Sequence, residues 1–446
     1  MKHHGAVEGK ARRSEPFHFM VGIDGATQFH QVCLIDAERQ VLEEKQIEHS
    51  GSGMAQLIEL LMERSVGRPE QVAVAIETPR GAIVEALVEG QFAVFSLNPK
   101  QMDRFRDRHT VPGAKDDSRE AFVMADALRT DRHWFHRVRL DDPGIIRLRG
   151  LSRIEADLQQ ESVRTGHRLR ELLLRYYPQM LKLCPSVDEG WFWDLLTIAP
   201  LPAKATKLKP AKIEQILKKH RIRRMDAAQV LTELKVPSLV LAPGSAEVAS
   251  EHVLMLLPLL RFLRQQMSDL SQRIQGLLDE MALPGQGQEP RDVTILLSVP
   301  GVGRKVAATL LTEASQPLAE RNYHALRSYA GVAPITRQSG KKRLVVMRQS
   351  CNPRLRNAIY HGACVHAQHD ERAKKHYAAL RAKGHSHGGA IRGIADRLLA
   401  VLITMLRTKT LYDPAFPALP KLRPELPEPA KIKVLERRIR LRRDET

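Results

Sequence analysis

The sequence predicts an N-terminal α/β domain followed by a long, mainly helical region. Short apolar runs with strand character lie before residue 100, where they alternate with segments of helical spacing. Beyond residue 140 the strand signals vanish, and two long charged stretches carry leucines at helical spacing. The chain has 446 residues, more than one core of roughly 100 to 200 residues uses, so we expect two globular domains joined by helices.

The first 140 residues read as a layered α/β domain. The run FHFMVGID at 17–24 is a buried strand, and QVCLIDAERQVLEEKQIEH supplies two more strands, separated by the polar turn AERQ. A three-strand meander followed by alternating helices and strands is typical of an α/β layer of the ribonuclease-H type. The remaining elements are expected as a helix at 53–65, a strand at 71–77, a helix at 81–89, a strand at 92–99 and a helix that begins near Lys115.

The middle of the chain is expected to be helical. Residues 144–175 and 246–281 could pack as an antiparallel pair or a coiled coil, and Pro258 should kink or break the second helix. Between them, the basic run Lys204–Arg224 reads as a loop leading into a short helix, and ALPGQGQEP at 282–290 reads as a linker. The expected division is an α/β domain at 17–140, a helical and basic region at 141–290, a mainly helical domain at 291–408 and a Pro-rich, then basic tail at 409–446.

The charge balance favours a polyanionic partner. Lys and Arg number 70 against 51 Asp and Glu, which gives a formal charge of +19 and places nucleic acid first among candidate partners. Ribosome-associated and membrane-surface proteins share such a balance, so charge alone assigns no function. The longest apolar stretches fall short of the roughly 20 residues that cross a bilayer, and the first residues lack the apolar region of a secretory signal. We expect a cytoplasmic protein without a membrane partner, and the scattered cysteines support no disulfide framework.

Acidic side chains come from three separate segments of the α/β domain. Asp24 ends the first strand, Glu77 ends the fourth, and Asp117 and Glu120 share a face of the helix that follows Lys115. The first and fourth strands of a ribonuclease-H-like sheet are neighbours, so these carboxylates should converge. Converging carboxylates suit Mg2+, and two ions roughly 3.5–4 Å apart stabilise the attacking and leaving oxygens of a phosphodiester displacement. Each acid alone is more often structural, but their joint placement favours a metal site.

A helix-hairpin-helix pattern opens the second domain. In ILLSVPGVGRKVAATLLTEA, Gly301 and Gly303 permit a tight turn whose amide groups open a helix, which is a suitable seat for a phosphate. Arg304 and Lys305 add positive charge, so the pattern predicts nucleic-acid binding with little sequence preference. The alternative is a tight turn between two core helices.

A serine in a basic loop is a second candidate group. Ser339 precedes Gly340, and its neighbours include Arg337, Lys341, Lys342 and Arg343. A free serine is a poor nucleophile and needs a base or a metal, and no His–Asp partner lies close in sequence. The residues alone therefore do not select Ser339 over Ser328 or Ser350, and a solvated turn residue is the alternative.

At these residues the chain resembles the insertion-sequence one-ten family of transposases, also called DEDD transposases. The resemblance extends from about Met20 to Arg407. The N-terminal half matches through GID, AIETPRG, NPKQ and AKDDSREAFVMADALRTD, and the C-terminal half through SVPGVG, YAGVAP, RQSGK and NPRLRNAIY. Any one motif would be weak, but their agreement in the family's order over both halves is specific.

The resemblance implies roles for the candidate residues. It implies that the first domain is RuvC-like and that the second is the transposase domain. It also implies that Asp24, Glu77 and Asp117 bind Mg2+ and that Ser339 is the nucleophile. The fourth family position is usually Asp, and here it is Glu120. Its longer side chain puts activity, more than fold, in doubt, with Asp116 and Asp126 as nearby substitutes.

The resemblance also implies a mechanism and partners. The serine attacks a DNA phosphate to form a 5′-phosphoserine, and the released 3′-hydroxyl later attacks the corresponding link on a second DNA. Family members act as homo-oligomers, dimers or tetramers, with two Mg2+ ions per composite site, and a bridge RNA guides them. This would make Lys204–Arg224 an RNA or DNA contact and the paired long helices an oligomer interface. The alternatives are a RuvC-type hydrolytic junction nuclease and a decayed transposase that only binds nucleic acid.

Overall fold

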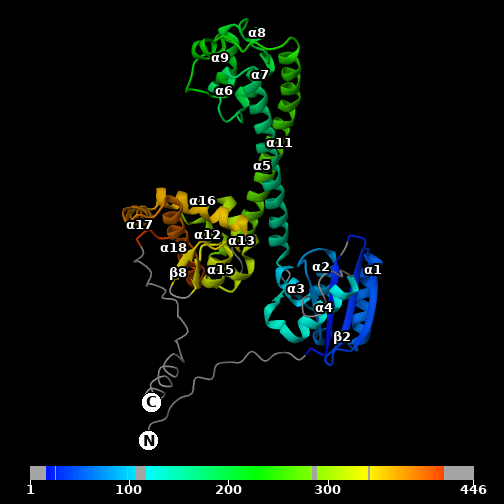
Figure 1. Cartoon of the computed structure of the whole chain (residues 1–446). Coiled ribbons are helices and arrows are strands. Elements are labelled where there is room, and N and C mark those ends of the chain that lie inside the picture. Colours follow the sequence, from blue (N-terminus) through cyan, green and yellow to red (C-terminus); the bar gives the residue numbers. More distant parts are fainter. Residues whose placement is uncertain are drawn as a thin grey trace, which may run out of the picture. The chain divides into compact units, whose positions relative to one another are not determined.

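The chain folds into two compact units. The computed structural model describes residues 17–25, 27–97, 99–106, 117–139, 141–283, 289–339 and 342–415. Unit 1 comprises Met1–Asp141 and unit 2 comprises Asp142–Thr446. Unit 1 holds a mixed sheet and unit 2 is mostly helical (Figure 1), as the sequence predicted at this level. Lys115, Asp116, most of the predicted linker and the tail beyond residue 415 lie outside the described residues.

Unit 1 is built on a six-stranded sheet in the order β3-β2-β1-β4-β5-β6. β1 pairs antiparallel with β2 and parallel with β4, β4 pairs parallel with β5, and β6 returns antiparallel to β5. The five longer strands were predicted from the sequence, whereas β6 is too short to give a pattern. The strands are β1 (Phe19–Gly25), β2 (Phe29–Asp36), β3 (Val41–Glu48), β4 (Val72–Ile76), β5 (Ala93–Ser96) and β6 (His136–Arg137).

Helices cover both faces of the sheet. The alternation of β1 gives Val21 and Ile23 to a core shared with α1 (Gly51–Arg64) and α2 (Ala82–Glu89). Met20 lies in the core on the other face, which α4 (Asp117–Asp131) covers, with α3 (Pro99–Arg106) beside it. Gly22 also faces α4, and a Cβ at Gly22 would lie only 1.8 Å from the carbonyl oxygen of Ala121. α4 therefore packs directly on the β1 backbone.

Two long helices form the centre of unit 2. The start of α5 (Pro143–Tyr176) shares a core with the end of α11 (Ser245–Ala282), and the end of α5 shares one with the start of α11. The two helices are thus antiparallel, as predicted, and lie side by side (Figure 1). The prediction for Pro258 was wrong in one respect, because α11 continues through it without a break. The apolar seam packed against α5 outweighs the one backbone hydrogen bond that proline removes.

A small helical cap, hereafter the tip, joins the far ends of α5 and α11. For this segment the sequence predicted only a loop leading into a short helix over Lys204–Arg224, the stretch that contains α9 (Pro210–Lys219). Its core forms where Tyr176, Trp191 and Phe192 are buried, and Trp193 Nε1 donates to the carbonyl of Val187 at 2.8 Å. The helices are α6 (Gln179–Leu183), α7 (Gly190–Ile198), α8 (Pro202–Ala205), α9 (Pro210–Lys219) and α10 (Ala227–Leu234).

The rest of unit 2 is a helical bundle with one β-hairpin. The hairpin corrects the prediction that no strand follows residue 140. Its sequence does not alternate between apolar and polar residues, because Leu344 and Val345, on opposite faces of one strand, are both exposed. No described helix is long and apolar enough to cross a membrane. The elements are α12 (Asp292–Leu297), α13 (Arg304–Glu313), α14 (Ser315–Ala319), α15 (Tyr323–Tyr329), β7 (Ile335–Ser339), β8 (Lys342–Val346), α16 (Pro353–His369), α17 (Glu371–Ala382) and α18 (His387–Thr408).

Candidate active-site edge and nucleic-acid contacts

The strand register brings Asp24 and Glu77 together. The parallel ladder of β1 and β4 pairs Ile23 with Ile76, so the next residue on each strand continues the same register. Neighbouring strands lie about 4.8 Å apart and alternate residues share a face. Gly22 faces α4, so Asp24, two residues later, lies on the face of the sheet that α4 covers. Glu77 takes the adjacent position on that face, at the edge where β1 and β4 end. Asp24 is half-buried and Glu77 is exposed, so the pair is open to solvent.

The first turn of α4 lies at the same edge. Ala121 packs against Gly22, whereas Leu128 and Met20 line a hollow near the beginning of β1. α4 therefore runs opposite to β1, and its N-terminus is at the end of the strand that carries Asp24. Asp117 and Glu120 belong to this first turn, where a helix favours negative charge. Three segments thus deliver carboxylates, the kind of ligand a divalent cation takes, to one edge. Among the described residues, however, no three of these acids bring their ligand oxygens within 4.8 Å of one another.

Asp126 does not belong to this group. It lies six residues beyond Glu120, about 9 Å further along α4 at 1.5 Å per residue, and only 6% of it is exposed. Its carboxylate pairs with Arg39 at 3.3 Å and with Arg129 at 2.8 Å. The structure therefore removes Asp126 as a substitute for Glu120.

Another group with metal-ligand chemistry lies in the tip. Cys184, Asp188 and Glu189 place ligand atoms within 4.8 Å of one another. Both carboxylate oxygens of Glu189 are already engaged, one by Arg224 at 2.6 Å and the other by the indole N–H of Trp191 at 2.7 Å. Burial raises the pKa of the Cys184 thiol, which disfavours the thiolate that binds metals. These contacts stabilise the tip and do not suit a metal ion.

The turn between α12 and α13 has a structural role at its first glycine. Gly301 has a φ of +92°, and a Cβ there would lie 2.4 Å from the carbonyl oxygen of Gly362 on α16. The imidazole Nδ1 of His366 lies 2.7 Å from the carbonyl oxygen of Pro300, which fastens the same turn to α16. Gly303 is exposed and has no atom within 4 Å of an added Cβ. The open side of the turn is therefore at Gly303.

The two cations after this turn differ in their surroundings. Arg304 donates to the Glu155 carboxylate of α5 at 3.0 Å, and 18% of the Arg304 side chain is exposed. Lys305 lies 3.7 Å from the same carboxylate but is 60% exposed. Arg304 thus forms an ion pair inside unit 2, and its contact with nucleic acid stays a prediction. Gly303 and Lys305 keep an exposed position suited to a phosphate.

Ser339 ends a strand and does not lie within a loop as the sequence suggested. It is the last residue of β7 and pairs with Lys342, the first residue of β8. Gly340 and Lys341 lie outside the described residues, and only the backbone of Ser339 and Lys342 is described. Arg337 is exposed on β7, opposite Leu344. Ser339 thus belongs to unit 2, whereas the four acids belong to unit 1.

Part of the basic run at 204–224 is used inside the tip. Lys219 and His220 contact the Asp194 carboxylate at 2.8 and 2.9 Å, and Arg261 contacts it at 3.0 Å. Burial opposes ionisation of Asp194, but these hydrogen bonds outweigh it and lower its pKa to about 2. Exposed cations remain along α8 and α9 at Lys204, Lys207, Lys209, Lys212 and Lys218.

Similar proteins are transposases and insertion-element proteins. A family model of the DEDD transposases of IS110 matches residues 21–178, and a model described as "Transposase IS116/IS110/IS902 family" matches residues 293–378. The chain is 32% identical over 408 residues to the mini-circle putative transposase for IS117 of Streptomyces coelicolor, covering 88% of this chain and 94% of that protein.

Two further relatives extend this comparison. The chain is 28% identical to the insertion element IS110 uncharacterized 43.6 kDa protein of Streptomyces coelicolor, over 91% of this chain and 98% of that protein. The putative transposase y4uE of Sinorhizobium fredii is 46% identical over 211 residues, which are 47% of this chain and 59% of that protein.

Proposed function

The chain belongs to the IS116/IS110/IS902 family of transposases, and from this premise we propose that it exchanges DNA strands through an acidic metal site and a nucleophilic serine. As a transposase of this family it cleaves and rejoins DNA. The observation that carries the proposal is the common edge of Asp24, Glu77 and the first turn of α4. The strand order β3-β2-β1-β4-β5, with its first three strands antiparallel, supports a RuvC-like, ribonuclease-H-type unit 1.

The acidic edge is the proposed place for Mg2+, with two ions per composite site. Asp24, Glu77, Asp117 and Glu120 would hold the ions, because three segments place acidic residues at this edge and both Asp24 and Glu77 are open to solvent. Bound Mg2+ would neutralise the carboxylates and draw phosphate oxygens into the site. Because the carboxylates determine where the ions would bind, they also determine where a phosphodiester would lie relative to the sheet.

Ser339 is the proposed nucleophile. Its Oγ forms a bond to the DNA phosphorus as the bond from phosphorus to the 3′ oxygen breaks. The serine loses its proton, and the departing 3′ oxygen gains one. The product is a 5′-phosphoserine and a free 3′-hydroxyl, which restores a phosphodiester when it attacks the corresponding link on a second DNA. The position of Ser339 in the last pair of the β7–β8 ladder supports this role, since the end of a hairpin can enter a groove of DNA.

The nucleic-acid contacts are proposed at two exposed basic surfaces. Gly303 and Lys305 lie on the open side of the α12–α13 turn, where a helix-hairpin-helix motif would bind a phosphate. The exposed lysines of α8 and α9 would bind DNA or a bridge-type guide RNA. Their long side chains carry charge into solvent, which suits phosphate contacts without sequence preference.

A homo-oligomer is proposed because α11 carries a second apolar stripe. Val248, Met255, Leu259 and Phe262 follow one another at intervals of seven, four and three residues, which places them on one helical face. They are 67%, 74%, 38% and 58% exposed, although the opposite stripe packs against α5. An exposed apolar stripe of this kind marks a protein interface, and a second copy of the paired helices would cover it.

The proposal is tested by trapping the covalent intermediate. Full-length protein is incubated with an element-end DNA whose cleaved strand carries a 3′-label, downstream of the cut, and adducts are resolved under denaturing conditions. Wild type should give a protein–DNA adduct in Mg2+. Asp24→Asn and Ser339→Ala should both lose it. Matched controls are Glu59→Gln, an exposed acid on α1 at the other face of the sheet, and Ser350→Ala, an exposed serine after β8. If Ser339→Ala cuts at a comparable rate and leaves free ends, the enzyme is a hydrolytic nuclease and the serine proposal fails.

A further inference from the structure

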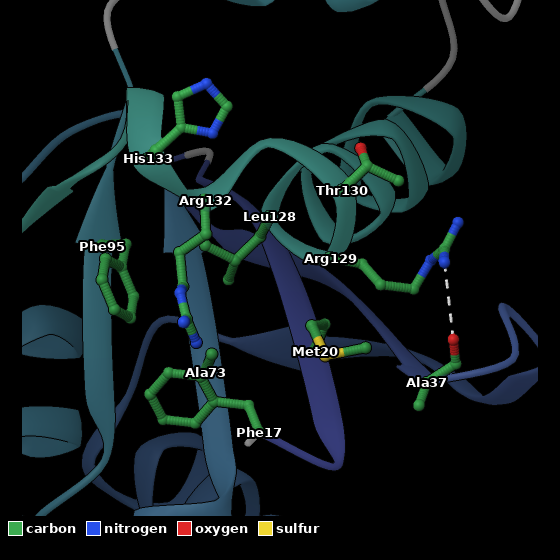
Figure 2. Close-up of a pocket in the computed structure, with 10 residues that line it drawn as sticks. All are labelled: Phe17, Met20, Ala37, Ala73, Phe95, Leu128, Arg129, Thr130, Arg132 and His133. Atoms are coloured by element: carbon green, nitrogen blue, oxygen red, sulfur yellow. Dashed lines mark hydrogen bonds between the residues drawn. The ribbon is translucent and has the colours of Figure 1, made fainter. Parts of the chain in front are cut away.

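A hollow of about 610 Å³ lies in unit 1 at the end of the sheet opposite the acidic edge. Met20 and Ala73, which pair near the beginnings of β1 and β4, form part of its floor (Figure 2). Asp24 lies four residues further along β1, about 13 Å away at 3.3 Å per residue. The hollow is therefore separate from the proposed metal site. Its lining comprises Phe17, Met20, Ala37, Ala73, Phe95, Leu128, Arg129, Thr130, Arg132 and His133.

The inner surface of the hollow is apolar and aromatic. Met20, Ala73 and Leu128 are buried and belong to the core under α4. The ring of Phe17 stands edge-on to the ring of Phe95, with centroids 5.9 Å apart and planes at 83°. A sulfur and two aromatic rings offer contact surface to a planar ring. The volume lies within the roughly 300–1,000 Å³ of small-molecule sites.

Cationic groups surround this apolar floor. The guanidinium of Arg132 lies 4.8 Å from the centroid of the Phe17 ring, and Figure 2 shows its side chain reaching down toward that ring. On the other side, Asp126 holds Arg129 at 2.8 Å, and Arg129 also donates to the carbonyl of Ala37 at 3.4 Å. The two guanidinium groups thus stand on opposite sides of the hollow, where they can meet an anion attached to a ring.

The chain leaving the hollow is basic and aromatic. Trp134 is 53% exposed, and its ring lies 5.2 Å from that of His133. The same stretch continues along the edge strand β6 with three exposed basic residues, His136, Arg137 and Arg139. Exposed aromatic rings between cations are how proteins bind single-stranded nucleic acid, since bases stack on the rings and phosphates meet the charges.

We propose that this hollow is a nucleotide-binding site for a single strand of nucleic acid. One base enters between Phe17 and Met20, its phosphate lies against Arg132 and His133, and the next base stacks on Trp134. A nucleotide carries both a planar ring, which suits the apolar and aromatic floor, and an anion, which suits the cationic rim. The site goes beyond the proposed strand exchange, because it needs neither the acidic edge nor Ser339.

The fluorescence of Trp134 gives a direct measurement. The chain has three tryptophans, and Trp191 and Trp193 are only 1% and 2% exposed, so a stacking base quenches Trp134 selectively. Full-length protein in EDTA is titrated with a single-stranded 12-mer, with thymidine 5′-monophosphate and with inorganic phosphate. EDTA keeps the measurement independent of the metal site, so a failure here leaves the proposed strand exchange standing.

We expect the 12-mer to quench the fluorescence of Trp134 and Trp134→Phe to remove the signal. The mononucleotide supplies only the base in the hollow, so it should compete with the 12-mer. Phe17→Ala should weaken binding about 5- to 140-fold, since a stacked base is worth about 1–3 kcal/mol and 1.4 kcal/mol is tenfold. Arg132→Gln should weaken it about 10- to 100-fold through loss of a charge-assisted contact. Controls are Arg64→Gln and Phe29→Ala, an exposed cation on the far face and an exposed ring on β2.

Three results would overturn the proposal. In the first, no nucleotide or strand changes the fluorescence. In the second, inorganic phosphate competes as well as the mononucleotide, so that no base is recognised. In the third, Phe17→Ala and Arg132→Gln bind like the controls while melting at the wild-type temperature. Quenching by the 12-mer without quenching by the mononucleotide would support the site as one for a nucleotide within a strand, and quenching by both would extend it to the free nucleotide.

Discussion

Replacing Arg304 with alanine separates a role in folding from a role in nucleic-acid binding. Only 18% of the Arg304 side chain and 10% of the Glu155 side chain are exposed, and they meet at 3.0 Å. Removing one partner of a buried pair costs about 3–5 kcal/mol, because the other charge stays buried without its counter-charge. Lys305, which is 60% exposed and 3.7 Å from the carboxylate, offsets a small part. We expect Arg304→Ala to lower the free energy of unfolding of unit 2 by about 3 kcal/mol.

Two assays on the same variants decide the point. Urea denaturation followed by circular dichroism gives the free energy of unfolding, and DNA binding over a salt series gives the number of phosphate contacts. Lys305→Ala should leave unfolding within about 0.5 kcal/mol of wild type and reduce the salt slope by about 1. The double variant Arg304→Met with Glu155→Leu should regain most of the lost stability, since no buried charge remains. The reasoning is refuted if Arg304→Ala unfolds like wild type and loses a phosphate contact.

Two further predictions concern the turn and the tip. Gly301→Ala should destabilise unit 2 by more than about 2 kcal/mol, because φ is +92° and the new Cβ would meet the backbone of Gly362. Gly303→Ala should cost less than about 1 kcal/mol. The midpoints of urea unfolding of the two variants measure this difference. The Asp194 pKa of about 2 lies below its ordinary 3.8, so its ionised form contributes about 2 kcal/mol above pH 4, which is lost as pH falls towards 2. Asp194→Asn should therefore lower the melting temperature at pH 7 but match wild type at pH 2, and an equal deficit at both values would contradict this.

The acidic edge was predictable because it follows from strand order. Once β1 and β4 are neighbours, Asp24 and Glu77 take adjacent positions, since each directly follows the last residue paired between the two strands. The strands themselves could be predicted because their apolar residues either alternate with polar ones or follow one another without a break. Local patterns of this kind can be seen in a single sequence, and they predicted the α/β unit and the two long helices.

Contacts between distant segments were not predictable. Arg304 and Glu155 are 149 residues apart, and nothing near either residue signals the pair. The turn at Gly301 looks the same in sequence whether it contacts a phosphate or, as here, the backbone of α16. The described side chains of the β7–β8 hairpin form no buried face, so this part of the sequence shows no apolar alternation. The residues of a segment indicate whether it forms a helix, a strand or a turn. Which of its side chains are buried depends on distant segments that only the fold brings into contact.

The close approach of α4 to β1 determines how Glu120 can act. A Cβ at Gly22 would lie 1.8 Å from the Ala121 carbonyl, so the helix backbone touches the strand. Glu120 directly precedes Ala121, and its main chain is therefore held in place. The extra methylene of glutamate, about 1.5 Å longer than aspartate, must be accommodated by the side chain alone and not by a shift of the helix.

This argument predicts the behaviour of two variants at Glu120. Glu120→Asp restores the acid usual in the family on an unchanged backbone, so cleavage should be equal to wild type or faster. Glu120→Gln keeps the size but removes the charge, and it should lose cleavage while melting at the wild-type temperature. Adduct formation in Mg2+ measures both. If Glu120→Asp is as inactive as Glu120→Gln, the site requires the longer carboxylate, and the position of the cation relative to α4 differs from the one proposed.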